Sequence, residues 1–341
     1  MAALAVLLGV FVLGAAPTRD TDEIVDPAAQ ASGDACNGHV ELCTRRYSDV
    51  AFPAAHNAMS AADEPGWFLA EQPTGLTGQL DAGVRVLLID SYYGRPTDRP
   101  GFTVTSTESF EGALSASKQD YDPAVVQSAL RLRAALTPSV TGPAVPYLCH
   151  GLCETGSTPM AEALTDVHDW MQGHPREVVT LFIEDAVSPA DTAAVVEQTD
   201  LLPSVHTPVA GQPWPTLEQM IDSGHRLVVL AERRGGGAAH PWLLQGFDRV
   251  QDTPFTNPTA ADLSCALNRG AADDPLLLIN NWLSGFDALV SNARKVNAAP
   301  VLGPYVERCR RERGQIPNFV AVNYVDQGDL YAVVDRLNVV R

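Results

Sequence analysis

Positive charge is scarce in this sequence. Its 341 residues contain 23 Lys and Arg against 41 Asp and Glu, so the formal net charge is -18 at pH 7 and the pI is about 4.7. Nucleic acids and anionic bilayers are bound through basic patches, and the sequence has no recognisable amphipathic basic helix. We therefore expect no nucleic-acid partner and an acidic surface that favours solubility.

A hydrophobic run long enough to span a membrane comfortably is also lacking near the N-terminus. Residues 2–16 are apolar, which suits the core of a signal peptide. No Lys or Arg precedes this run, and Pro17 follows it where cleavage would be expected, so an uncleaved anchor or a misplaced start codon are alternatives. We expect residues 1–16 to be a signal peptide or N-terminal anchor of a secreted protein, residues 17–35 a disordered lead-in, and residues 36–341 one domain.

Cysteine is present in a small, even number. Six cysteines in an exported chain indicate disulfides, and six allow fifteen pairings. Proximity in sequence favours the sequential pairing, which is Cys36–Cys43, Cys149–Cys153 and Cys265–Cys309. A zinc site is the alternative, because Cys149, His150 and Cys153 are clustered, but no second Cys/His pair with finger-like spacing accompanies them.

Short apolar runs alternate with helical patterns along the chain. We expect strands at 50–55, 84–89, 145–148, 177–183, 225–231, 276–279 and 319–322, a loop over 94–107 and a long loop over 235–258. Helices are expected at 123–136, 158–172, 190–198, 216–223, 287–296, 305–311 and 329–337. This alternation predicts an α/β fold with a parallel sheet, and either a single closed (β/α) barrel of the TIM type or an open doubly wound sheet satisfies it.

Polar residues stand at the ends of the apolar runs, where such sheets keep their chemistry. The candidates are His56 and Asn57, Asp90, His150, Glu184, Arg233, and Asn281 with Trp282. Histidine titrates near neutrality and suits acid–base work, whereas carboxylate and amide oxygens suit calcium or magnesium. The arginine could bind phosphate, and the tryptophan could stack on a sugar ring or touch lipid.

The order of four motifs resembles a known family. His-Asn at 56–57, Gly-Val-Arg-x-Leu-Leu-x-Asp at 83–90, Cys-His-Gly at 149–151 and Leu-Phe-Ile-Glu at 181–184 resemble the X region of phosphatidylinositol-specific phospholipase C and related phosphodiesterases. The tail PNFVAVNYVDQGDLYAVVDRLN looks like the secreted microbial branch. The resemblance implies a barrel, with His56 as base, His150 as acid, and Asn57, Asp90 and Glu184 holding Ca2+ or Mg2+.

Two positions depart from that family. Metal-dependent relatives carry an acidic residue where this sequence has Leu88, which leaves a cation one carboxylate short unless a group such as Asp185 substitutes. Bacterial relatives use an aspartate to orient the base histidine, and the matching residue here is Asn323, with Asp326 as an alternative.

We therefore expect a secreted, monomeric phosphoric diester hydrolase that cleaves a phospholipid or a related soluble phosphodiester and meets membranes transiently. Arg233, Asn281 and Trp282 are the expected substrate-binding residues. The alternatives are a glycerophosphodiester- or sphingolipid-type phosphodiesterase on the same barrel, and a non-catalytic barrel that binds inositol phosphates or a cell-surface partner.

Overall fold

The computed structural model describes residues 34–68, 70–107, 137–284 and 289–340, together with residues 110, 124, 127, 131, 133 and 135. The predicted signal peptide or anchor lies outside the described residues, as does the predicted lead-in except for its last two residues, and so does most of the helix predicted at 123–136.

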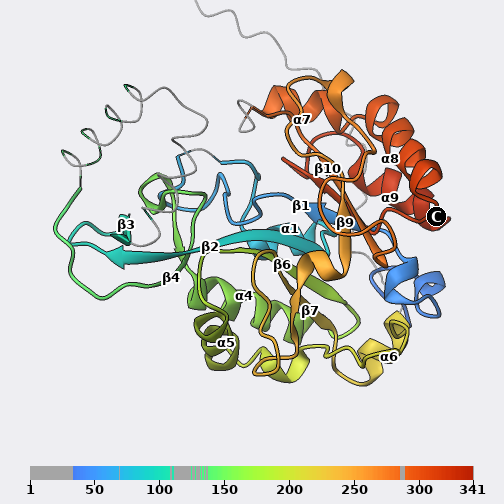
Figure 1. The fold of residues 1–341 in the computed structure, drawn as a ribbon, viewed down its shortest axis with the longest axis horizontal. Coiled ribbons are helices and arrows are strands. Elements are labelled where there is room, and N and C mark those ends of the chain that lie inside the picture. Colours follow the sequence, from blue (N-terminus) through green and yellow to red (C-terminus); the bar gives the residue numbers. More distant parts are fainter. Residues whose placement is uncertain are drawn as a thin grey trace, which may run out of the picture. The chain divides into compact units, whose positions relative to one another are not determined.

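The centre of the fold is a curled parallel sheet (Figure 1). Its eight described parallel strands are β1 (Phe52–Ala55), β2 (Val86–Pro96), β6 (Val179–Asp185), β7 (Leu227–Ala231), β8 (Leu243–Gln245), β9 (Val250–Asp252), β10 (Leu276–Asn281) and β11 (Phe319–Val322). Each of these strands from β1 to β8 pairs with the next one along the chain, as does each from β9 to β11, and β11 pairs with β1. The described residues show no pairing between β8 and β9. The fold is thus an irregular (β/α) barrel with one open seam, which confirms the barrel prediction.

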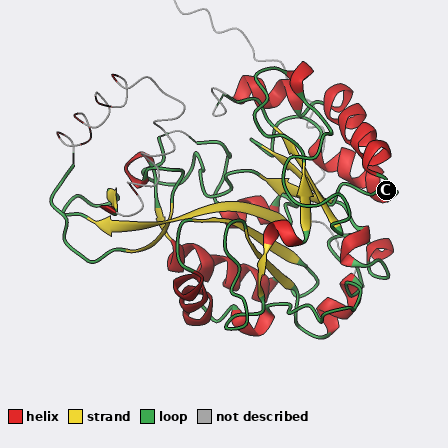
Figure 2. Cartoon of the chain, in the orientation of Figure 1, coloured by secondary structure: helices red, strands yellow, loops and turns green. Residues whose placement is uncertain are grey.

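Helices surround this sheet, as the red and yellow elements of Figure 2 show. The described α-helices are α1 (Leu76–Asp81), α4 (Met160–Gly173), α5 (Pro189–Gln198), α6 (Leu217–Asp222), α7 (Val290–Val296), α8 (Ala299–Arg313) and α9 (Leu330–Asn338). Short 3-10 turns cover Val40–Leu42, Tyr47–Asp49, Cys153–Thr155, Leu202–Ser204, Gly246–Asp248 and Ala260–Asp262. None of the described helices is both long enough and apolar enough to cross a bilayer.

Local chemistry fixes several helix ends. Thr216 and Gln219 form a capping box at the start of α6, and Ser188 accepts a hydrogen bond from the backbone of Asp191 at the start of α5. Gly314, at a φ of 69°, ends α8 in the left-handed conformation that glycine adopts without strain.

Three predictions about the strands need correction. The segment 145–148 forms β4 (Val145–Leu148), but it runs antiparallel to the second half of β2 and is not a barrel strand. The expected loop at 235–258 contains β8 and β9, which are too short to give a recognisable apolar run. The loop expected after residue 94 contains the end of β2 and an added strand, β3 (Thr103–Thr105), while β5 (Thr158–Pro159) pairs with β4.

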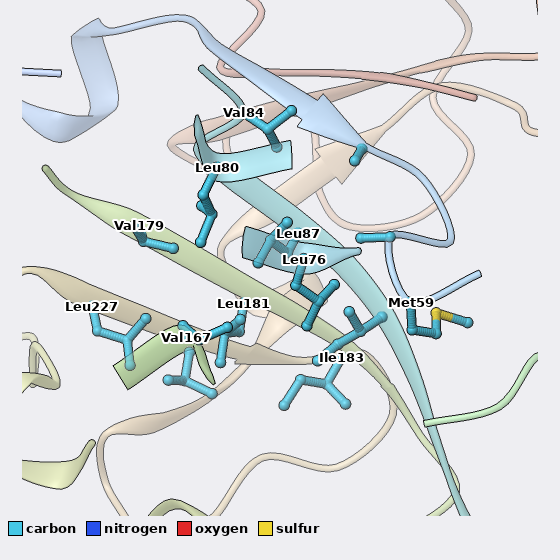
Figure 3. Packing of buried hydrophobic residues seen from close by; sticks show 14 of the residues in the cluster. Met59, Leu76, Leu80, Val84, Leu87, Val167, Val179, Leu181, Ile183 and Leu227 are labelled. Atoms are coloured by element: carbon cyan, nitrogen blue, oxygen red, sulfur yellow. The ribbon is translucent and has the colours of Figure 1, made fainter. Parts of the chain in front are cut away.

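Side chains alternate along each barrel strand between two apolar layers. Residues such as Leu181 on β6 face the helices, and Figure 3 shows this layer with Leu80 of α1 and Val167 of α4. The next residues along the strand, such as Phe182, face the barrel interior. Because both layers are apolar and buried, polar side chains on the interior side gather at an end of the barrel.

One end of the barrel is sealed. Tyr47, Phe52 and Phe319 are fully or almost fully buried, and the rings of Tyr47 and Phe52 lie 5.1 Å apart. Because Phe52 and Phe319 are the first residues of their strands, these three aromatic side chains close the amino-terminal end of the barrel. The carboxyl-terminal end is left for polar groups.

Candidate active site

A cavity of about 300 Å³ opens at the carboxyl-terminal end of the strands. It is lined by His56, Asn57, Leu88, Ile89, Asp90, Phe182, Glu184, Glu232, Arg233, Phe255, Arg269, Leu278, Asn280 and Trp282. Its polar residues continue the inward-facing positions of the strands, which explains why charges collect here and not among the helices.

His56 follows β1 and is held on two sides. Its Nδ1 lies 2.7 Å from Oδ1 of Asn323, and its ring stacks on Trp282 with centroids 3.7 Å apart and planes 8° apart. Nδ2 of Asn323 donates to Oε2 of Glu71 at 3.0 Å, so the amide must present its oxygen to the histidine. His56 therefore donates through Nδ1, and in the neutral ring Nε2 is left free to accept a proton.

Asn323, and not Asp326, therefore orients His56. The Asp326 side chain is exposed and accepts a hydrogen bond from its neighbour Gln327 at 2.7 Å. This settles the choice that the sequence left open.

Glu71 is a site residue that the sequence reasoning missed. Its side chain is only 4% exposed, yet it contacts both histidines: Oε2 lies 3.4 Å from Nδ1 of His56, and Oε1 lies 3.3 Å from Nδ1 of His150. Asn57 also donates to Oε2, at 3.0 Å. Burial by itself would raise the pKa of Glu71, but the hydrogen bonds and charges of the two histidines hold it well below its usual range.

His150 lies in a tight loop after β4. A disulfide joins Cys149 to Cys153, which closes the loop around the histidine and shows that the zinc interpretation of this cluster is wrong. The other two bonds, Cys36–Cys43 and Cys265–Cys309, confirm the rest of the predicted pairing. The His150 side chain is 47% exposed. The partial burial of the ring opposes its charge, but the hydrogen bond to Glu71 and the charges of Asp90, Glu71 and Glu184 outweigh this and raise the pKa of His150 to about 9.

The three predicted metal ligands all line the cavity. Asp90 and Glu184 are register partners on β2 and β6, and Asn57 has a left-handed backbone (φ 46°) that asparagine tolerates better than most residues. Glu184 forms an ion pair with Arg233. The Asp90 carboxylate accepts no hydrogen bond from the described residues, and burial followed by the charge of Glu184 raises its pKa well above the usual range.

Their donor chemistry fits a hard cation, since carboxylate and amide oxygens are what Ca2+ and Mg2+ prefer. The described residues contain no group of three or more His, Cys, Asp or Glu side chains arranged to hold a metal, and the predicted set has only two such carboxylates. Asp185 does not add a third, because its carboxylate accepts hydrogen bonds from the backbone of Arg233 and Arg234, at 2.7 and 3.0 Å.

Of the three predicted substrate-binding residues, Arg233 and Trp282 line the cavity and Asn281 does not. Asn281 is fully buried on the other side of β10 and donates to Oδ1 of Asn297 at 3.0 Å. The alternation of the strand brings its neighbour Asn280 to the cavity instead, where the Oδ1 atom of Asn280 is buried and has no hydrogen-bond partner among the described residues.

An ion network that the sequence did not reveal completes the cavity wall. Arg269 pairs with Glu232 and with the buried Asp252, whose Oδ2 lies 2.6 Å from Nη2. Burial is the main cause that raises the pKa of Glu232 to about 7, with Arg269 opposing it. The cavity thus combines two guanidinium groups with several carboxylates, a surface suited to a ligand that carries both phosphate and hydroxyl groups.

A family model described as PI-PLC X 1 matches residues 103–338, a range that includes His150 and Glu184 but begins after His56 and Asp90. The chain belongs to the PI-PLC X domain family.

Two relatives come from the fungus Arthroderma benhamiae. An uncharacterized secreted protein is 25% identical over 89% of this chain and 64% of its own length, so this chain spans less than two thirds of that relative. PI-PLC X domain-containing protein 1 is 26% identical over 89% of each protein. A mutant of phosphatidylinositol-specific phospholipase C from Staphylococcus aureus is 11% identical, with a TM-score of 0.48, over 88% of this chain and 95% of that one.

Proposed function

We propose that this protein is a phosphoric diester hydrolase that cleaves a phospholipid of the phosphatidylinositol type, with His56 as general base and His150 as general acid. The observation that carries the proposal is the shared carboxylate: Nδ1 of both histidines faces Glu71, at 3.4 and 3.3 Å. Nε2 of His56 is free to accept a proton, whereas His150, whose pKa is about 9, carries a proton to give at neutral pH.

The reaction follows from these two states. His56 takes a proton through Nε2 from an attacking hydroxyl, either a neighbouring hydroxyl of the substrate or water. The new oxygen–phosphorus bond forms as the bond to the leaving oxygen breaks, and that oxygen receives the proton of His150. Arg233 and Arg269, which line the cavity, would attract the phosphate oxygens.

A divalent cation is the second part of the proposal. Asn57, Asp90 and Glu184 would hold Ca2+ or Mg2+, with Glu184 exchanging its contact to Arg233 for the ion. The ion would supply positive charge to the phosphate oxygens. Calorimetry with Ca2+ and Mg2+ tests this part without substrate. We expect binding to the full protein and its loss in Asp90→Asn, and no binding to either would refute the metal site.

A lipid substrate also suits the cavity rim. Phe255 lines the cavity and is 40% exposed, an apolar group where acyl chains or a membrane surface would lie. We propose transient membrane contact by a monomer outside the cell. Three disulfides and a secreted relative support the extracellular location.

Turnover by the purified protein tests the reaction class. Phosphatidylinositol, a glycerophosphodiester and sphingomyelin are offered in turn, with added calcium or with chelator. We expect turnover of phosphatidylinositol that falls at least about 10²-fold in His56→Ala and in His150→Ala. Activity on only one of the other two substrates would move the assignment to that class, and no turnover of any of them would favour the binding barrel.

A further inference from the structure

Glu71 lies on a segment that is neither strand nor helix but is anchored by hydrogen bonds. Its backbone N–H donates to Ser60 at 2.8 Å, and its carbonyl accepts from Tyr324 at 2.7 Å. The next residue, Gln72, donates to the carbonyls of His56 and Val322 at 2.7 and 3.0 Å. The segment is therefore fastened to the carboxyl ends of β1 and β11, directly beside His56.

The contacts on the two carboxylate oxygens of Glu71 divide between the two histidines. Oε2 accepts from Nδ2 of Asn323, and Oδ1 of the same amide accepts from Nδ1 of His56, so carboxylate, amide and ring form one chain of hydrogen bonds. Oε1 faces His150 directly, at 3.3 Å from Nδ1. Asn57 donates to Oε2 as well and closes the network.

The two asparagines explain why a separate carboxylate is needed. An amide can orient an imidazole ring, but it cannot stabilise the positive charge that a base acquires when it takes a proton. Asn323, which contacts Nδ1 of His56, is such an amide, and Asn57 is the residue next to His56. Glu71 supplies the missing charge. Its carboxylate is buried and lies within 3.5 Å of the rings of both His56 and His150.

We propose that Glu71 is a positioning residue that serves both histidines with one charge: through Asn323 it fixes His56 with Nε2 free, and by direct contact it aims His150 toward the leaving group. This proposal rests on the proposed function. It predicts that one substitution disturbs the base and the acid together, although Glu71 does not line the substrate cavity.

A role confined to stability is the competing explanation, so the experiment needs readouts that stability alone does not move. Glu71→Gln keeps the size of the side chain and removes its charge, and Glu71→Asp keeps the charge on a shorter arm. The matched control is Glu177→Gln, which removes a buried carboxylate paired with Arg85 at 2.6 Å. All variants are made in the full chain, and circular dichroism establishes that each is folded.

Kinetics on phosphatidylinositol provides the first readout. For Glu71→Gln we expect kcat to fall at least about tenfold with KM changed by less than about threefold, because the lost interaction acts in the transition state. Glu71→Asp should recover part of kcat, and Glu177→Gln should keep both constants near wild type. A folded Glu71→Gln with unchanged kcat, or with loss only in KM, would overturn the proposal.

Nitrogen-15 NMR of the histidine rings provides the second readout and needs no substrate. In the wild-type protein at pH 7.5 we expect the His56 ring to be the tautomer protonated at Nδ1, with assignment from His56→Ala. Glu71→Gln should populate the other tautomer. A wild-type ring protonated at Nε2 would overturn the proposal even if Glu71→Gln failed to fold. Because this spectrum is independent of turnover, an inactive protein with the expected tautomer would refute the proposed function and not the network.

Discussion

Replacing Asn323, which directly follows the last strand, by aspartate should damage this protein. In Asn323→Asp, the amide that donates to Glu71 at 3.0 Å becomes a second carboxyl at the same distance. Two carboxylates about 3 Å apart repel by roughly 5 kcal/mol at an effective dielectric constant of 20, so one of them should take up a proton.

The sign of the pH dependence follows from that proton. The pKa of the pair is raised in the folded state, so the folded protein holds a proton that the unfolded chain releases. Stability then falls as pH rises between the unfolded pKa, about 4, and the raised pKa. At pH 5 the protonated carboxyl can donate to Glu71 as the amide did, and we expect stability within about 1 kcal/mol of wild type. Between pH 5 and pH 8 the free energy of unfolding of the variant can fall by about 4 kcal/mol relative to wild type, because each pH unit contributes up to about 1.4 kcal/mol.

Urea denaturation of wild type and variant at pH 5 and pH 8 measures this difference. The control is Asp326→Asn, an exposed position on the same loop, which should change the free energy of unfolding by less than about 0.5 kcal/mol at either pH. Equal stability of Asn323→Asp and wild type at both pH values would refute the hydrogen-bond network assigned to Glu71.

Three further predictions address the site. The pKa of His150 is about 9, so a general acid at this position stays protonated at neutral pH. A pH profile of kcat should therefore decline as pH rises through about 9, and a decline near pH 6.5 would contradict the contact of His150 with Glu71. Trp282→Leu removes the stack on His56 and should cost about 1–3 kcal/mol in thermal denaturation and also lower kcat, whereas a loss of stability alone would contradict its role in orienting the ring. Arg233→Ala frees Glu184 from a partly exposed ion pair and should strengthen calcium binding, measured by calorimetry, up to about fivefold. Arg234→Ala is the control, and weaker calcium binding in Arg233→Ala would contradict the proposal that Glu184 exchanges Arg233 for the ion.

The sequence was sufficient to predict a parallel α/β fold, because the strands that matter most are continuous apolar runs followed by polar residues, whereas the choice of a barrel over an open sheet came from the family resemblance. Runs such as the one at 177–183 need no tertiary context to be recognised. The strands β8 and β9 have three residues each, and their pairing partners, not their own composition, make them strands. The antiparallel direction of β4 depends on the long end of β2, which the sequence presents as a loop.

The residues of the site that lie at strand ends could be predicted from the sequence, because alternate residues of a strand face the same side of the sheet. His56, Asp90 and Glu184 share the inward parity of their strands and line the cavity. The same parity, applied to β10, would have selected Asn280 and not Asn281, because adjacent residues of a strand face opposite sides.

Glu71 could not have been found by this reasoning. It follows no strand, and a glutamate in a segment rich in glycine and proline is normally exposed to solvent. Its burial results from the tertiary contacts of residues 70–72 with β1 and β11, which are remote in sequence from one another.

The most direct test of the account is phosphorus NMR of the products when the full protein acts on phosphatidylinositol. The account predicts a cyclic inositol phosphodiester or the inositol phosphate derived from it, formed by the wild type and reduced at least about 10²-fold in both His56→Ala and His150→Ala. Product formation that persists in the two folded histidine variants, or a wild type that leaves the lipid intact, would contradict the claim that this histidine pair cleaves the phosphodiester.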